Sequence, residues 1–204
     1  MTFHPLMPYK EGFQKSDRVL LEKGEPFAYT AERAAELEEI CSKYPPERRK
    51  SAVLAALYLV QEQQGHITAN GARAVAEFLR ITPADVEDVV TYYVMFFRAP
   101  VGKYVLQVCR TLSCALAGAE RVTESLSEKL GLKVGETDAS GMFTLLEFEC
   151  LGACDRAPVL MINDEGWQER LRPEDVGRFL DDLKARGYAA LTGCHLHVEK
   201  ERAG

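Results

Sequence analysis

YVLQVCRTLSC, residues 104–114, joins a run of strand-forming residues directly to two cysteines with C-x4-C spacing. FTLLEFECLGAC, residues 143–154, repeats that order with C-x3-C spacing. Each run predicts a strand that ends at its cysteine pair. Because the ends of neighbouring strands lie about 5 Å apart, two loops that leave the same edge of a sheet can bring four thiolates around one small object. The four cysteines are Cys109, Cys114, Cys150 and Cys154.

The spacing of these cysteines indicates what they hold. Zinc ribbons and fingers mostly use C-x2-C pairs, and thioredoxin-type disulfide enzymes need the same spacing. Neither pair in this sequence has it. Iron–sulfur clusters accept longer spacings, and a 2Fe-2S cluster needs four Cys ligands. Spacing alone therefore favours a 2Fe-2S cluster, and zinc or thiols without a metal stay as alternatives.

The residues around the cysteines suit a negatively charged cluster. Cys114 lies at the start of a helix predicted over residues 115–130, where backbone N–H groups favour a thiolate. Gly152 allows the backbone to approach the sulfurs closely. Arg110 and Arg156 either add positive charge beside two ligands or are simply solvated.

The rest of the second half predicts a thioredoxin-like α/β domain over residues 99–190. A strand over 159–162, a hairpin turn over 163–166 and a helix over 173–186 follow the second cysteine pair. The Ala157-Pro158 bond, which precedes this strand, is a candidate for a cis peptide. The order β-α-β-β-α is that of a mixed sheet covered by helices.

The first half predicts a helical bundle over residues 29–98, so the fold class is α+β. A fourth helix begins at Thr82, with Pro83 at its first position and an acid three residues after the cap. Residues 1–28 have no sustained periodicity and are expected to be a mobile or partner-bound arm, and residues 191–204 a polar tail. The first three helices are expected over residues 30–44, 47–64 and 72–79.

Composition limits the classes of function. The chain has 204 residues and a net charge of −6 without a basic block, which argues against nucleic acid as a partner. The longest apolar runs, 52–60 and 89–97, are too short to cross a bilayer, and no signal or transit peptide is visible. These features favour a cytosolic setting. There, six cysteines are more often metal ligands than disulfides.

Several segments together resemble the NuoE family, the small 2Fe-2S subunits of the NADH dehydrogenase module of respiratory complex I (NADH:quinone oxidoreductase). They are YPPERRKSAVLAALYLVQEQQGHIT (44–68), PVGKYVLQVCRTLSCALAGAE (100–120), GMFTLLEFECLGACDRAPVLMIND (141–164) and the closing helix. The resemblance runs from about residue 30 to residue 186. It implies a cluster held by the four cysteines, and docking on a larger flavoprotein subunit that carries FMN and oxidises NADH, beside further iron–sulfur subunits.

The resemblance also implies a location and leaves alternatives. The chain would be peripheral on the cytoplasmic face of the inner membrane, in a bacterium rather than in the mitochondrial matrix. No G-x-G-x-x-G or G-x-x-x-x-G-K-[ST] motif is present, so no complete NADH site is expected on this chain alone. The equivalent subunit of an NAD-linked hydrogenase or formate dehydrogenase is an alternative. A zinc-stabilised assembly module is another, from a different class.

Other chemically notable residues are expected to have structural roles. Cys41 lies on the apolar stripe of the first helix, where a free cysteine behaves as a small hydrophobe. The tail contains Cys194, His195 and His197, which could bind a metal but fit better as a polar tail lying on a partner. The aromatic residues at 92, 93, 96 and 97 are expected in the core or at the domain junction.

Overall fold

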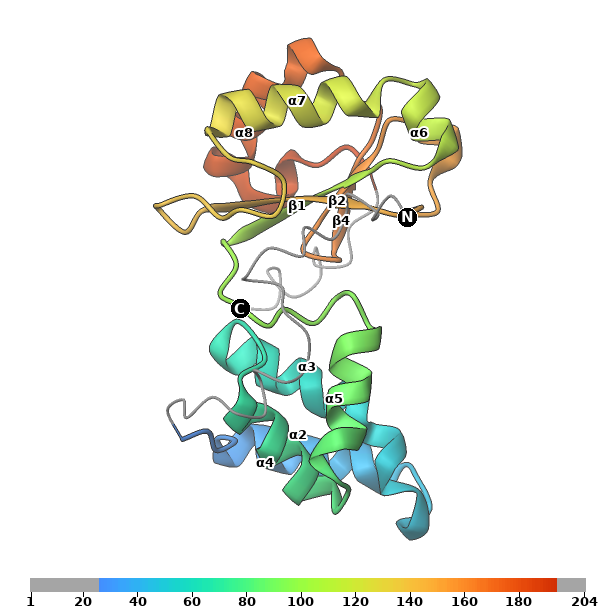
Figure 1. Ribbon diagram of the computed structural model, residues 1–204, viewed down its shortest axis with the longest axis vertical. Coiled ribbons are helices and arrows are strands. Elements are labelled where there is room, and N and C mark those ends of the chain that lie inside the picture. The colour runs from blue at the N-terminus through green and yellow to red at the C-terminus, as the bar shows by residue number, and fades with distance from the viewer. Residues whose placement is uncertain (1–25, 194–204) are drawn as a thin grey trace, which may run out of the picture. The chain divides into compact units, whose positions relative to one another are not determined.

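The computed structural model describes residues 26–193 of the chain. They divide into two compact units between Pro100 and Val101 (Figure 1). The first unit is helical, and the second contains a four-stranded sheet with helices, which confirms the α+β fold class. No helix within the described range combines the length and apolar character that a bilayer span needs. The predicted arm falls almost wholly outside the described residues, as do Cys194, His195 and His197.

The helical unit contains the expected helices, with one difference. The single helix expected over residues 47–64 is two elements, a 3-10 helix followed by an α-helix. Arg48 has non-helical backbone angles (φ −113°, ψ 19°), so regular α-helix begins only at Val53. The elements are α2 (Ala31–Ser42), η1 (Pro46–Ala52), α3 (Val53–Gln64), α4 (Ala69–Leu79) and α5 (Pro83–Tyr92).

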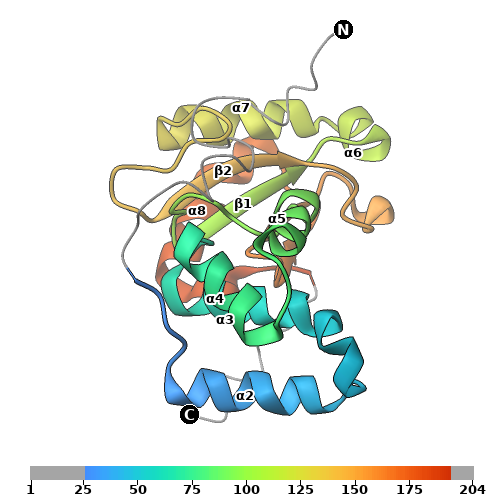
Figure 2. The same ribbon diagram turned by 60° about the horizontal axis from the view of Figure 1, so that its bottom comes forward.

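Helix α3 is the centre of this unit and packs against α2, α4 and α5 (Figure 2). Cys41 is buried in the shared core, as expected for a small hydrophobe. Tyr58 of α3 is 38% exposed, and its ring contacts Phe96 edge-on. Phe96 and Phe97 are buried as expected, whereas Tyr92 is 77% exposed.

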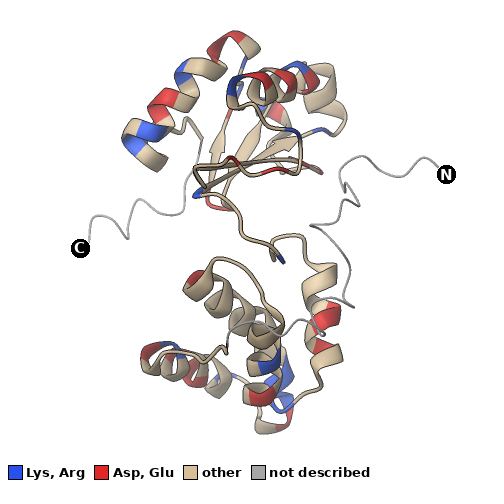
Figure 3. Ribbon diagram, turned by 60° about the vertical axis from the view of Figure 1, so that its left-hand side comes forward, with Lys and Arg blue, Asp and Glu red and all other residues tan. Residues whose placement is uncertain are grey.

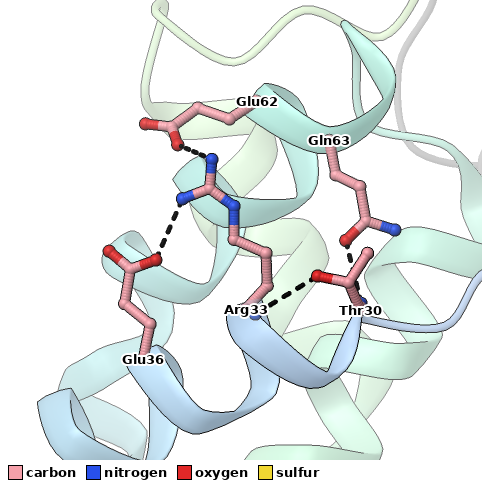
Figure 4. Close-up of polar contacts among 5 residues, drawn as sticks. All are labelled: Thr30, Arg33, Glu36, Glu62 and Gln63. Carbon is pink, nitrogen blue, oxygen red and sulfur yellow. Dashed lines mark hydrogen bonds and ion pairs between the residues drawn. The ribbon is translucent and has the colours of Figure 1, made fainter. Parts of the chain in front are cut away.

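Polar contacts at the start of α2 tie this helix to α3 (Figure 4). The Thr30 hydroxyl caps α2 by accepting a hydrogen bond from the Arg33 N–H. The Arg33 guanidinium pairs with Glu36 at 2.9 Å and with Glu62 of α3 at 2.8 Å. The Thr30 N–H donates to the Gln63 side chain. The N–H groups of Thr30 and Arg33, at the start of α2, therefore both have hydrogen-bond partners.

The capping box expected at α5 is present. The Thr82 hydroxyl accepts from the Asp85 N–H, and the Asp85 carboxylate accepts from the Thr82 N–H. Lys50 of η1 donates to the same carboxylate, which links η1 to α5. Near the other end of α5, the buried Glu87 carboxylate pairs with Arg98.

The second unit is a mixed sheet with the strand order β2-β1-β3-β4. Strand β1 is parallel to β2 and antiparallel to β3, and β3 is antiparallel to β4. The turn between β3 and β4 has positive φ at Asn163 and Asp164, as the predicted hairpin requires. The elements are β1 (Tyr104–Cys109), α6 (Leu112–Leu116), α7 (Ala119–Leu130), β2 (Phe143–Phe148), η2 (Cys154–Arg156), β3 (Leu160–Ile162), β4 (Gly166–Gln168), η3 (Pro173–Asp175), α8 (Val176–Arg186) and η4 (Gly187–Ala190).

Helices α7 and α8 contact each other and share one hydrophobic core with the sheet. The helix expected over residues 115–130 is broken, because Gly118 adopts a left-handed conformation (φ 92°) between α6 and α7. The short helix α6 begins at Leu112, so Cys114 lies in its first turn, at a helix start as expected but on a different helix from α7. The Ala157-Pro158 bond is cis.

The capping box gives a stability prediction. Thr82→Ala removes the side-chain acceptor for an N–H at the start of α5, and we expect it to cost about 1 kcal/mol of unfolding free energy. Urea unfolding followed by far-ultraviolet circular dichroism measures this loss. Fluorescence of Trp167, the one tryptophan of the chain and part of the sheet unit, is a second probe, and equal midpoints of variant and wild type by both probes would contradict this role for Thr82.

The Asp85 carboxylate makes the stability of the fold depend on pH. Hydrogen bonds from Lys50 and Thr82 lower the pKa of its carboxyl to about 2 from an ordinary 3.8. Because the folded-state pKa is the lower one, this stabilisation is complete above pH 3.8 and is lost as the pH falls toward 2. Asp85→Asn should lower the urea midpoint at neutral pH and match the wild type near pH 2. Equal midpoints at neutral pH would contradict this role for Asp85.

Candidate metal centre

Both cysteine pairs lie at the same edge of the sheet because β1 and β2 are parallel. Cys109 is the last residue of β1 and is level with Phe148, the last residue of β2. The Arg110 N–H extends the pairing by donating to the Phe148 carbonyl at 3.0 Å. Cys150 lies two residues beyond the end of β2. The two loops that carry the cysteines therefore start side by side.

The four thiols lie within interacting distance of one another. The Cys150 and Cys154 sulfurs are 3.5 Å apart. This is too far for a disulfide, which is about 2.0 Å long, and close to the roughly 3.7 Å between two thiolates on one tetrahedral metal with bonds near 2.3 Å. Cys114 interacts with Cys109 and with Cys154, and Cys109 also interacts with Cys154.

The sulfurs are arranged as two pairs. Among residues 26–193, no group of three or more Cys, His, Asp or Glu side chains surrounds a single point in a way that could hold one metal ion. A 2Fe-2S cluster instead needs two sulfurs on each of two irons. One pair, Cys109 and Cys114, is buried, and the other, Cys150 and Cys154, is exposed. The arrangement therefore fits a two-iron cluster bound at the rim of the sheet.

Backbone N–H groups and side-chain hydroxyls contact the four sulfurs. The Val159 N–H donates to Cys114, and the Gly152 N–H donates to Cys150. Gly152 has φ 80°, and a methyl group there would meet no atom within 4 Å, so its backbone conformation is what calls for glycine. Hydroxyls supply the other contacts: Thr111 to Cys109 at 3.2 Å and also to Cys150, and Ser113 to Cys154. Donors of this kind stabilise thiolate and sulfide charge.

The free thiols differ in acidity. Burial raises the pKa of the Cys114 thiol to about 11. The Gly152 N–H lowers the pKa of Cys150, and contact with Cys150 raises that of Cys154. Iron binds the thiolate form, so loading the site would release protons from the thiols.

The two arginines beside the ligands are paired with carboxylates. Arg110 lies 3.6 Å from Glu149, and Arg156 lies 3.0 Å from Asp155 and 3.8 Å from Glu169. Carboxylates therefore balance part of the positive charge that the two arginines bring to the cysteine loops.

Sequence reasoning missed Thr111, Ser113 and Val159 as donors to the sulfurs. The two hydroxyl residues lie inside the C-x4-C loop, and that position was the available signal. No sequence signal marked Val159, because it contributes a backbone N–H and not its side chain.

The family model for thioredoxin-like [2Fe-2S] ferredoxins matches residues 37–184. The chain belongs to this family. A thioredoxin-like [2Fe-2S] ferredoxin has a 2Fe-2S cluster as its cofactor, and the paired thiols with their donors fit that cluster. This outcome confirms the cofactor that the cysteine spacing favoured.

Named relatives of this ferredoxin cover most of its length. NADH-quinone oxidoreductase subunit 2 of Thermus thermophilus is 39% identical over 79% of this chain and 92% of its own length. A subunit of the NADH-quinone oxidoreductase of Rickettsia bellii is 39% identical over 78% of this chain and 95% of its own length. These relatives confirm the family resemblance of the ligand segments.

A solved structure shares the fold of this ferredoxin at lower identity. The crystal structure of an NAD+-reducing [NiFe]-hydrogenase in the air-oxidized state superimposes with a TM-score of 0.57 and 18% identity. The match covers 66% of this chain and 23% of the hydrogenase chain. At this identity the similarity is one of fold.

The paired thiols predict which cysteines matter for cluster retention. Serine at any one of the four ligand positions should reduce or abolish the bound iron and acid-labile sulfide. Cys41→Ser and Cys194→Ser are the matched controls and should keep both at the wild-type level. Analysis of iron and sulfide in the six single variants measures this. Full cluster content in a ligand-position variant, or loss in a control, would show that the ligand set is wrong.

Proposed function

We propose that this ferredoxin is the small electron-transfer subunit of an NADH:quinone oxidoreductase (complex I). It exchanges single electrons with the FMN of a partner flavoprotein subunit. The names of the bacterial relatives support this proposal, at 39% identity over most of the chain. The observation that carries it is the convergence of two thiol pairs at one sheet edge in a member of a 2Fe-2S family.

The four cysteines Cys109, Cys114, Cys150 and Cys154 hold the cluster in this proposal. The cluster, when bound, accepts and returns one electron at a time. The protein supplies the sulfurs and their hydrogen-bond donors, and it keeps water from the buried pair. The exposed pair faces outward, which gives a redox partner close access.

The NADH chemistry belongs to the partner in this proposal. The chain has no glycine-rich motif for a dinucleotide pyrophosphate. The helical unit, proposed as a domain over residues 29–98, supports a fixed partner, because a freely diffusing ferredoxin has no evident need for it. Within the complex the chain lies peripherally at the cytoplasmic face of the membrane, beside the flavoprotein and further iron–sulfur subunits.

A surface beside the exposed thiols suits the docking of that flavoprotein. Leu112 and Leu116 lie one turn apart on α6 and are 74% and 82% exposed, while Cys114 between them is buried. The segment from Thr111 to Ala119 contains no charged residue, although 27% of the chain is charged. Helices of both units carry acidic and basic residues elsewhere (Figure 3). An uncharged surface with two exposed leucines favours an apolar protein partner.

The docking surface is tested by a double variant. Leu112→Gln with Leu116→Gln should weaken binding to the flavoprotein by about tenfold, which corresponds to about 1.4 kcal/mol. Iron and sulfide content should stay at the wild-type level, since both side chains are largely exposed to solvent. Glu124→Gln on α7 is the matched control for an exposed polar position. Unchanged affinity of the double variant would place the interface elsewhere.

The function itself is tested by isolation of the native complex. The tagged chain, purified from its own cells, should carry a visible chromophore, give a 2Fe-2S EPR signal on reduction, and bring with it an FMN-containing subunit that oxidises NADH. Isolation with hydrogenase or formate dehydrogenase subunits instead would assign the chain to that complex. A colourless, EPR-silent chain with stoichiometric zinc would exclude electron transfer.

A further inference from the structure

Thr111 precedes α6 in the position where threonine usually caps a helix, but its hydroxyl does not cap. Threonines occupy the same position before α2, α4 and α5, and there each hydroxyl accepts a backbone N–H from the first turn. Thr111 has extended backbone angles (φ −75°, ψ 169°) like a cap, and yet it makes no side-chain cap hydrogen bond. The Thr111 hydroxyl therefore does not cap α6, although threonine at this position usually caps a helix.

The Thr111 hydroxyl points to a ligand sulfur instead. Its oxygen lies 3.2 Å from the Cys109 sulfur. Cys109 belongs to the buried pair, and Thr111 is itself partly buried, so this contact is largely shielded from water.

Iron binding fixes the direction of this hydrogen bond. Between a free thiol and a hydroxyl, either group can donate. A sulfur bound to iron has lost its proton and can only accept. A threonine hydroxyl has a single hydrogen. Thr111 therefore becomes the donor of its hydrogen bond with the Cys109 sulfur.

We propose that Thr111 raises the reduction potential of the cluster by donating its O–H to the ligand sulfur of Cys109. Reduction adds one electron to the cluster and makes or breaks no bond to the protein. The added negative charge spreads onto the sulfurs and strengthens a hydrogen bond that they accept. The reduced form gains more from the hydroxyl than the oxidised form does, which raises the potential.

Ser113 provides a graded comparison within the same loop. Its hydroxyl donates to Cys154. Ser113 is exposed, whereas Thr111 is partly buried. Water can replace the Ser113 hydroxyl more readily, so its removal should shift the potential less than removal of the Thr111 hydroxyl.

The test is a redox titration of the purified full chain, followed by EPR. Thr111→Val keeps the side-chain shape but has no hydroxyl, and it should move the midpoint potential to a more negative value. Thr111→Ser keeps the hydroxyl and should stay near the wild type. Ser113→Ala should give a smaller negative shift. Iron and sulfide content of each variant shows whether the cluster is intact.

The outcomes separate a role in the potential from a structural role. An unchanged or more positive potential in Thr111→Val with full iron would overturn the proposal. If Thr111→Val and Thr111→Ala both lose the cluster while Thr111→Ser keeps it, the hydroxyl serves retention and the proposal is also overturned. The inference rests on the electron-transfer role proposed above, but the titration needs no partner. Failure to bind a flavoprotein would therefore leave the potential shift intact, and a wild-type chain without a 2Fe-2S signal would end both proposals.

Discussion

The parallel pairing of β1 with β2 is the constraint on which the site depends. It places Cys109 level with Phe148, so that the two cysteine loops leave the sheet side by side. A shift of one residue in this register would turn the side chains of one strand to the opposite face. The buried side chains of both strands oppose such a shift, because they form one core with α7 and α8. The geometry of the thiols is therefore maintained by the hydrophobic core, which includes Cys109 and Cys114 themselves.

Much of the fold could be predicted because its signals are local. The strand before each cysteine pair and the capping box at Thr82 both depend on residues close together in sequence. The break at Gly118 was missed, because a lone glycine within a helical pattern is often tolerated. The break becomes visible in the left-handed backbone of Gly118, which separates α6 from α7.

The ligands of the candidate site could be predicted from the sequence, but the groups around them mostly could not. Four cysteines at characteristic spacing are visible in the sequence, but the direction of each donor depends on loop conformation. The arginines illustrate this difference. Their positions next to Cys109 and near Cys154 suggested positive charge, and only the structure shows that Glu149 and Glu169 offset it. Nothing in the sequence pattern showed that the hydroxyls of Thr111 and Ser113 in the first loop contact the sulfurs.

The unequal burial of the two cysteine pairs gives the site two different sides. The inner pair is part of the hydrophobic core, whereas the outer pair lies on loops open to solvent. A cluster held by these four cysteines would therefore be shielded by the core on one side and open to water and oxygen on the other. A neighbouring protein that covered the open side would protect the bound cluster from oxygen.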